Sequence, residues 1–177
     1  MKKKVRTLWK NHRCINVCDC DCHQGENPLQ PLKLNPLSIA KYFWERGIDD
    51  YALIQDFIYL TYIEALWKNL LLFEEKYQAW EEGPVLESVY QKMRNHYKKH
   101  KELDSLFSKT KDVEDKAVKS CLTKVYRDYQ KSKKKGKTID FFFQVQDAPW
   151  ESAREKLGNS KRHSAAMEIK NIMALAK

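Results

Sequence analysis

The residues best suited to chemistry lie close together near the N-terminus. Four of the five cysteines and one histidine fall within ten residues, and they are Cys14, Cys18, Cys20, Cys22 and His23. Thiolates and imidazole are the ligands that Zn²⁺ and Cu⁺ prefer, so this segment has the donors to wrap one ion. The spacing C-x3-C-x-C-x-C-H is not the C-x2-C pairing of structural zinc sites. The sequence therefore leaves two interpretations open, a zinc site and a tail that binds metal only adventitiously.

Two other groups of metal-binding or nucleophilic type occur in helical patterns. His96 and His100 are four residues apart, a spacing that can place two imidazoles on one metal. No glutamate completes an H-E-x-x-H motif, and Lys98 and Lys99 between the histidines favour a solvated face. Cys121 occupies an apolar position of a helical stripe, where a small buried residue is expected rather than a nucleophile.

Known catalytic motifs do not occur in the chain. It has no Gly-rich phosphate loop, no G-x-S-x-G motif and only five glycines at which a ligand can approach the backbone closely. The carboxylate pairs Glu74-Glu75 and Glu81-Glu82 lie in polar surroundings, where we expect them to be exposed. We therefore predict a binding protein that is not an enzyme and needs no cofactor, the N-terminal metal site aside.

The net charge of the chain suggests a binding partner but does not identify its class. The 177 residues, enough for one compact domain, include 33 lysines and arginines against 24 acidic residues, a net charge of +9. Much of the excess lies in runs at residues 2–4, 98–99 and 131–137. Such runs form solvated faces or bind an acidic or polyanionic partner.

Neither export nor membrane insertion is expected from this sequence. No stretch approaches the ~20 apolar residues that span a bilayer. The basic start MKKKVRTLWK is followed by Asn, His, Arg and Cys, where a signal peptide has an apolar segment. Four cysteines crowd into nine residues, whereas a disulfide scaffold spreads its cysteines through the fold. We predict a cytoplasmic protein with reduced thiols and no membrane partner.

Hydrophobic periodicity separates an N-terminal extension from a helical domain. Residues 1–36 lack periodicity and contain Pro28, Pro31 and Pro36, which predicts a Cys-rich extension with little regular structure. Residues 37–177 form the domain. Asn35 or Ser38 caps its first helix, which ends at Gly47.

Several more helices follow from the same pattern. The aspartates at positions 49 and 50 suit the start of a second, central helix that reaches residue 66. Further helices are predicted over residues 85–100, from residue 112 to the lysine run, from 149 to 157 and from 164 to 173. Residues 103–108 are predicted to be a connection, and residues 139–145 fit a strand or a helix equally well.

The helices are interrupted once, around residues 71–85. Phe73, Tyr77 and Trp80 cannot share one helical stripe with Gly83 and Pro84 directly behind them. We therefore predict a short extended or hairpin element there. The fold expected is mainly α, a single-domain helical bundle with this one extended element.

The order of short motifs in the domain resembles the SocA-like Panacea domain, which is found in phage-associated proteins and toxin–antitoxin operons. The resemblance covers residues 37–172 and rests on five steps of the central region and one near the C-terminus. They are Ile58-Tyr59, Leu72-Phe73, Ala79-Trp80, Gly83-Pro84-Val85, Val89-Tyr90 and Pro149-Trp150 with Ala153. It favours a short helix over residues 139–145.

Two positions depart from the family pattern. The residue three before the tyrosine of the first step is commonly basic in the family, and this chain has Asp56 there. The family often has Thr-His before its Pro-Trp, where this chain has Val145-Gln146. Contacts that relatives make through those residues are therefore not carried over.

What the resemblance implies is a non-enzymatic antitoxin. Such a protein neutralises a cognate toxin by direct contact or, in the SocA branch, delivers the toxin to an ATP-dependent protease. Aromatic residues around a rigid turn suit a protein interface, so we expect the partner-binding residues to be Phe73, Tyr77, Trp80, Gly83, Pro84 and Tyr90. The primary role expected of Trp80 and Tyr90 is to hold the turn against the bundle, which is compatible with a contact to a partner. Nucleic-acid binding through the basic runs and metal sensing through the N-terminal cysteines are the alternatives.

Overall fold

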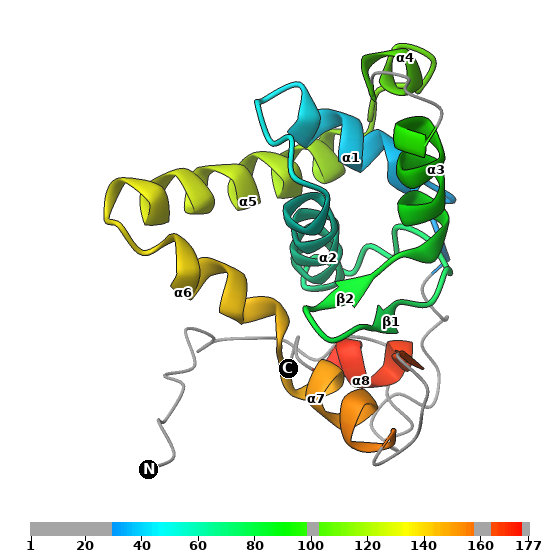
Figure 1. Cartoon of the computed structure of the whole chain (residues 1–177), viewed down its shortest axis with the longest axis vertical. Helices are drawn as coiled ribbons and strands as arrows, with labels where there is room; N and C mark the ends of the chain where they lie inside the picture. The colour runs from blue at the N-terminus through cyan, green and yellow to red at the C-terminus, as the bar shows by residue number, and fades with distance from the viewer. Residues whose placement is uncertain (1–29, 99–102, 158–163, 175–177) are drawn as a thin grey trace.

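Helix α2 (Tyr51–Leu66) is the element against which the others pack (Figure 1). The computed structural model describes residues 30–98, 103–157 and 164–174. Asp50 caps α2 by accepting a hydrogen bond from Leu53 N at 3.0 Å. Every residue from Phe57 to Leu66 is buried, as in a helix that is surrounded on all sides by protein. The predicted central helix is confirmed.

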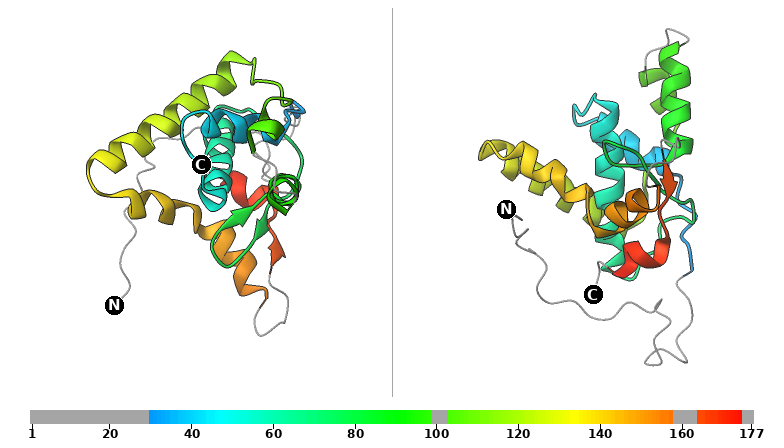
Figure 2. Two further views of the ribbon diagram at one scale, coloured as in Figure 1. Left: turned by 45° about the horizontal axis from the view of Figure 1, so that its top comes forward. Right: turned by 60° about the horizontal axis from the view of Figure 1, so that its bottom comes forward.

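The other elements surround α2 in chain order. They are α1 (Pro36–Trp44), β1 (Gln78–Ala79), β2 (Pro84–Val85), α3 (Glu87–Lys98), α4 (Leu103–Phe107), α5 (Lys116–Lys134), α6 (Thr138–Phe142) with the 3-10 turn Phe143–Val145, α7 (Ala148–Glu155), β3 (Ala165–Ala166) and α8 (Ile169–Ala174). The predicted mainly α fold is therefore confirmed. Helix α5 runs to one edge of the molecule and α6 returns from it (Figure 1), while α3 extends away from the remaining elements (Figure 2).

A small antiparallel sheet replaces helix at the predicted interruption. Its strand order is β2-β1-β3, with Gln78 opposite Val85 on one side of β1 and opposite Ala166 on the other. The hairpin between β1 and β2 is the extended element that Gly83 and Pro84 predicted. The third strand is a difference from the prediction, since residues 165–166 were expected to be helical. Pairing with the free edge of β1 satisfies their backbone groups there, and α8 begins only at Ile169.

One additional helix and one helix start also differ from the sequence prediction. Residues 103–107 form α4 rather than a connection, because Leu103 and Phe107 are both buried and the Phe107 ring lies 5.6 Å from that of Trp44. Helix α5 begins after its cap Asp115 and not at residue 112, because the preceding segment is fastened to α1 instead.

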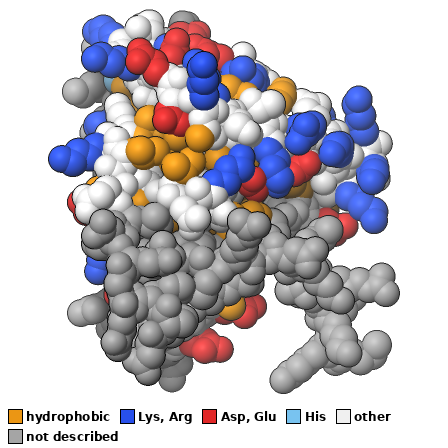
Figure 3. Space-filling view, turned by 180° about the vertical axis from the view of Figure 1, so that it is seen from behind, with side chains coloured by type: hydrophobic (Ala, Val, Ile, Leu, Met, Phe, Trp, Pro, Cys, Tyr) orange, Lys and Arg blue, Asp and Glu red, His pale blue; other side chains and the backbone are white. Residues whose placement is uncertain are grey.

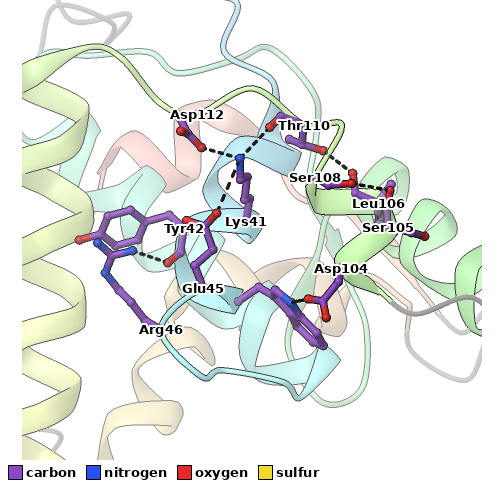
Figure 4. Close-up of polar contacts among 11 residues, drawn as sticks. Lys41, Tyr42, Glu45, Arg46, Asp104, Ser105, Leu106, Ser108, Thr110 and Asp112 are labelled. Atoms are coloured by element: carbon purple, nitrogen blue, oxygen red, sulfur yellow. Dashed lines mark hydrogen bonds and ion pairs between the residues drawn. The ribbon is translucent and has the colours of Figure 1, made fainter.

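Lys41 of α1 makes that attachment. Its ammonium group lies 2.7 Å from Asp112 Oδ1 and donates to the Thr110 carbonyl at 3.0 Å, as Figure 4 shows. Trp44 Nε1 donates to Asp104 Oδ1 at 2.7 Å. These contacts tie the segment from α4 to α5 against α1.

The end of the predicted N-terminal extension lies against the domain. Leu32 N donates to the Leu71 carbonyl at 2.8 Å, and Leu34 N donates to the Leu72 carbonyl at 2.9 Å. Residues 31–34 are thus held beside the segment that leads into the hairpin. Among the residues that the structure describes, no helix is both long and apolar enough to cross a membrane.

Candidate functional site

The hairpin that follows residue 77 turns through a loop of two residues. Trp80 N donates to the Gly83 carbonyl at 3.0 Å, and Gly83 N donates back to the Trp80 carbonyl at 3.3 Å, so Glu81 and Glu82 form the tip. A Cβ atom at Gly83 would lie 3.3 Å from Asp56 Oδ1. Glycine therefore suits the close approach of the hairpin to α2, since a larger residue would press on the Asp56 carboxyl.

A buried amide attaches the end of the hairpin to α2. Gln55 Oε1 accepts a hydrogen bond from Leu86 N at 2.9 Å, and Gln55 Nε2 donates to the Leu86 carbonyl at 3.4 Å. The side chain therefore pairs with Leu86 as a neighbouring strand would. This contact fixes where β2 ends and α3 starts relative to α2.

The opposite side of the hairpin is held by side chains from the C-terminal third of the chain. Trp150 Nε1 donates to the Trp80 carbonyl at 2.8 Å, and Gln146 Nε2 donates to the Glu82 carbonyl at 3.2 Å. Arg154 Nη1 donates to the Ala79 carbonyl at 3.4 Å. The hairpin is thus fastened from both sides, and its aromatic side chains are carried on a fixed backbone.

A pocket of about 520 Å³ opens between α2, the hairpin and α3. We call it the corner pocket; its main lining residues are Tyr51, Asp56, Trp80, Glu81, Glu82 and Tyr90. The rings of Trp80 and Tyr90 meet edge to face with their centroids 4.8 Å apart, and Tyr51 packs 4.6 Å from Tyr97. Trp80, Tyr90 and Tyr51 are each half-buried. The pocket therefore combines aromatic walls with carboxyl groups.

Asp56 is the carboxyl group set deepest among these residues. Burial, followed by the negative charges of Asp50 and Glu82, raises its pKa from 3.8 to about 8. No described residue donates a hydrogen bond to Asp56 or forms an ion pair with it. At neutral pH, Asp56 therefore holds its proton for most of the time unless a cation enters the pocket.

The predicted partner-binding residues divide into two groups. Trp80, Gly83, Pro84 and Tyr90 all line the corner pocket. Phe73 and Tyr77 do not, since they are only 5% and 1% exposed and belong to the core. Their assignment as contact residues is corrected: the Tyr77 ring packs edge to face against two tyrosines of α2, so it supports the hairpin from inside.

Sequence reasoning missed the contribution of α2 to the pocket. Tyr51 and Asp56 both line it, yet neither was predicted to contact a partner. The signals for Asp56 were an acidic residue within a largely apolar helix and its place at a position that is commonly basic in the resembled family. That the Asp56 side chain faces the pocket follows only from the packing of the hairpin against α2.

The candidate metal ligands Cys14, Cys18, Cys20, Cys22 and His23 lie outside the described residues, and so does His100. Within residues 30–98, 103–157 and 164–174, no group of three or more His, Cys, Asp or Glu side chains is arranged to hold a metal ion. Cys121 is completely buried on α5, and burial raises the pKa of its thiol. It occupies the core position that its place in the helical stripe predicted.

Basic side chains gather in two other places. A pocket of about 560 Å³ is lined by Lys92, His96, Lys109 and Lys111, among others. The end of α5 carries the exposed lysines of residues 131–137, and Figure 3 shows lysine and arginine side chains gathered along that edge. These regions differ in charge from the corner pocket.

Comparison of the chain with protein-family models, with curated proteins and with solved structures gave no match.

Proposed function

We propose that this chain is an antitoxin-like binding protein that neutralises a cognate toxin by direct contact. The contact surface is the corner pocket and the hairpin around it, which cover the working face of the toxin. The observation that carries the proposal is an open pocket of about 520 Å³ that is lined by aromatic side chains. The hairpin beside this pocket is held by hydrogen bonds from Gln55 on one side and Trp150 on the other. A binding role fits this surface better than catalysis does.

The energetics of protein interfaces support this use of the hairpin. Tryptophan and tyrosine dominate binding energy at interfaces, because they bury a large area with few rotatable bonds. Trp80 and Tyr90 already pack against each other, and the hairpin backbone is held by Gln55 and Trp150. Little conformational freedom is therefore lost when a partner docks, which favours affinity.

The resemblance to the SocA-like Panacea domain adds support. Four of its six motif steps, three within residues 79–90 and one at residues 149–150, meet at this pocket or directly behind it. Gly83 and Pro84 line the pocket together with Trp80 and Tyr90, and Trp150 binds the Trp80 carbonyl. An antitoxin of this type acts by occlusion or as an adaptor that presents the toxin to an ATP-dependent protease.

Co-expression tests the proposal. The toxin to use is the product of a gene adjacent to this one that stops growth when expressed alone and is tolerated with this chain. We expect Trp80→Ala to abolish growth rescue, because it removes one wall of the pocket. Phe143→Ala is the matched control, since Phe143 is an aromatic side chain that is 63% exposed and does not line the pocket.

The folded fraction of each variant is measured alongside by circular dichroism. Rescue by Trp80→Ala equal to that of the parent, at an unchanged folded fraction, would refute the assignment of this surface. Pull-down of the toxin with and without the protease then separates occlusion from delivery.

A second candidate function is nucleic-acid binding, which the exposed lysines of residues 131–137 and the pocket lined by Lys92 and Lys111 favour. Binding through phosphates weakens steeply as salt rises, whereas a packed protein interface weakens only modestly. A filter-binding titration with single-stranded RNA at 50 and 200 mM salt separates the two. Elemental analysis of the purified chain tests the third candidate, a metal-responsive N-terminal segment.

A further inference from the structure

We propose that the corner pocket binds an arginine side chain of the protein partner, with Asp56 as the acceptor of its guanidinium group. This inference rests on the function proposed above and specifies the chemistry of the partner. Three features of the pocket support it. The pocket is lined by aromatic rings, it contains several carboxyl groups, and no described residue donates a hydrogen bond to Asp56.

The aromatic walls suit a planar cation. Trp80, Tyr90 and Tyr51 all line the pocket, and a guanidinium group stacks on such rings through both its charge and its flat shape. The volume of about 520 Å³ falls within the ~300–1,000 Å³ that is typical of ligand sites. The pocket therefore has room for a long side chain and part of the backbone that carries it.

The carboxyl groups give the pocket a sign opposite to that of the whole chain. Glu81 and Glu82 line it beside Asp56, and Asp50 is close enough to raise the pKa of Asp56. The chain as a whole carries a net charge of +9. An arginine is therefore attracted to this pocket while being repelled by much of the remaining surface, which favours a defined docking position.

Two described cations lie near the hairpin, and neither of them pairs with Asp56. The Arg94 guanidinium lies 5.9 Å from the centre of the Tyr90 ring, and Arg154 binds the Ala79 carbonyl. Arg94 reaches the same ring that we assign to the partner, so this wall is suited to a guanidinium group. On this proposal, Asp56 and the aromatic lining residues make contact with the partner's guanidinium group.

Proton linkage gives the site a distinctive pH dependence. Among the described residues, the charged groups that act on Asp56 are Asp50 and Glu82, and both are acidic. Below the Asp56 pKa of about 8, binding of a cation must release a proton from this carboxyl. The affinity for arginine is therefore expected to fall by up to about tenfold for each pH unit below 8 and to level off above it.

The test uses the full chain and two blocked amino acids as probes. Nα-acetyl-arginine methylamide carries the guanidinium group, and Nα-acetyl-citrulline methylamide has the same shape without the charge. Nuclear magnetic resonance of the ¹⁵N-labelled protein follows the Gly83 amide and the Trp80 indole. We expect the arginine probe to shift both signals at millimolar concentration at pH 8, and the citrulline probe to leave them in place.

Two variants assign the effect to Asp56. Asp56→Asn is expected to weaken binding of the arginine probe at least tenfold and to remove its pH dependence. Glu114→Gln, which removes an exposed carboxyl outside the pocket, is the matched control and should bind as the parent does. Equal shifts with both probes, or unchanged arginine binding by Asp56→Asn, would overturn the inference.

Growth rescue separates this inference from the function on which it rests. Loss of rescue by both Trp80→Ala and Asp56→Asn supports both proposals. Loss with Trp80→Ala alone leaves the antitoxin proposal standing and rejects the arginine contact. Full rescue by both variants rejects the binding surface itself, and the arginine contact with the toxin fails with it.

Discussion

Replacing Asp56 with asparagine is expected to stabilise the folded chain at alkaline pH and to have little effect near pH 4. The Asp56 pKa is about 8 in the folded chain against an ordinary value of 3.8, so folding favours the protonated carboxyl. Stability that is fully present below pH 3.8 is therefore lost as pH rises to about 8. Asparagine carries no charge at any of these pH values, so the variant escapes this loss.

The size of the effect follows from the same pKa. Each pKa unit corresponds to about 1.4 kcal/mol, which sets an upper limit of about 6 kcal/mol on the cost of ionising Asp56 in the folded chain. The gain reaches this limit only above pH 8, where Asp56 is ionised in both states. With a urea dependence of about 2 kcal/mol per molar, it moves the unfolding midpoint by up to about 3 M.

Urea unfolding of the parent and of Asp56→Asn at pH 5, 7 and 9 measures the difference. The gain should grow with pH up to about 8 and then stay constant, and the control Glu114→Gln should show no such trend. A difference that is the same at pH 5 and pH 9 would refute the reasoning, because it would mean that the Asp56 carboxyl is as well solvated in the folded chain as in the unfolded one.

Other substitutions test the core and the hairpin by thermal unfolding, in which about 1 kcal/mol moves the midpoint by roughly 2–4 °C. Tyr59→Phe removes the 2.7 Å hydrogen bond to Asp147 and should cost about 2 kcal/mol. Tyr77→Phe should be neutral or stabilising, because its buried hydroxyl has no partner among the described residues. Lys124→Met removes the 2.8 Å ion pair with the buried Glu64 and leaves Lys68, at 3.8 Å, as its ion-pair partner among the described residues. It should cost about 2–3 kcal/mol, most of which a second change, Glu64→Gln, restores. Gly83→Ala should cost about 1–3 kcal/mol, because the added Cβ lies 3.3 Å from the Asp56 carboxyl oxygen and 3.5 Å from Val145; an unchanged midpoint would contradict the close approach described above.

Local sequence signals predicted the elements that depend on neighbouring residues. The Asn35 and Asp50 caps lie where helix starts were expected, and Gly83 and Pro84 marked the interruption that became the hairpin. Cys121 is buried as its position in the apolar stripe predicted. Capping, turn chemistry and periodicity act over a few residues, so one sequence is enough to read them.

The features that were missed depend on residues far apart in the chain. Strand β3 exists because residues 165–166 meet the edge of β1, and nothing in their local sequence indicates that meeting. Tyr77 was expected at the surface and lies in the core, because it packs against tyrosines of α2. Asp56 belongs to the pocket only because the hairpin folds back over α2.

The fastening of the hairpin by the C-terminal third of the chain has a consequence during protein synthesis. Trp80 leaves the ribosome long before Trp150 and Ala165, yet the hairpin is held by a hydrogen bond from Trp150 and a strand that includes Ala165. The nascent chain therefore cannot complete this surface until residue 166 has emerged. On the function proposed here, only finished molecules protect the cell, and a message cut short before that point yields a product with no protective effect.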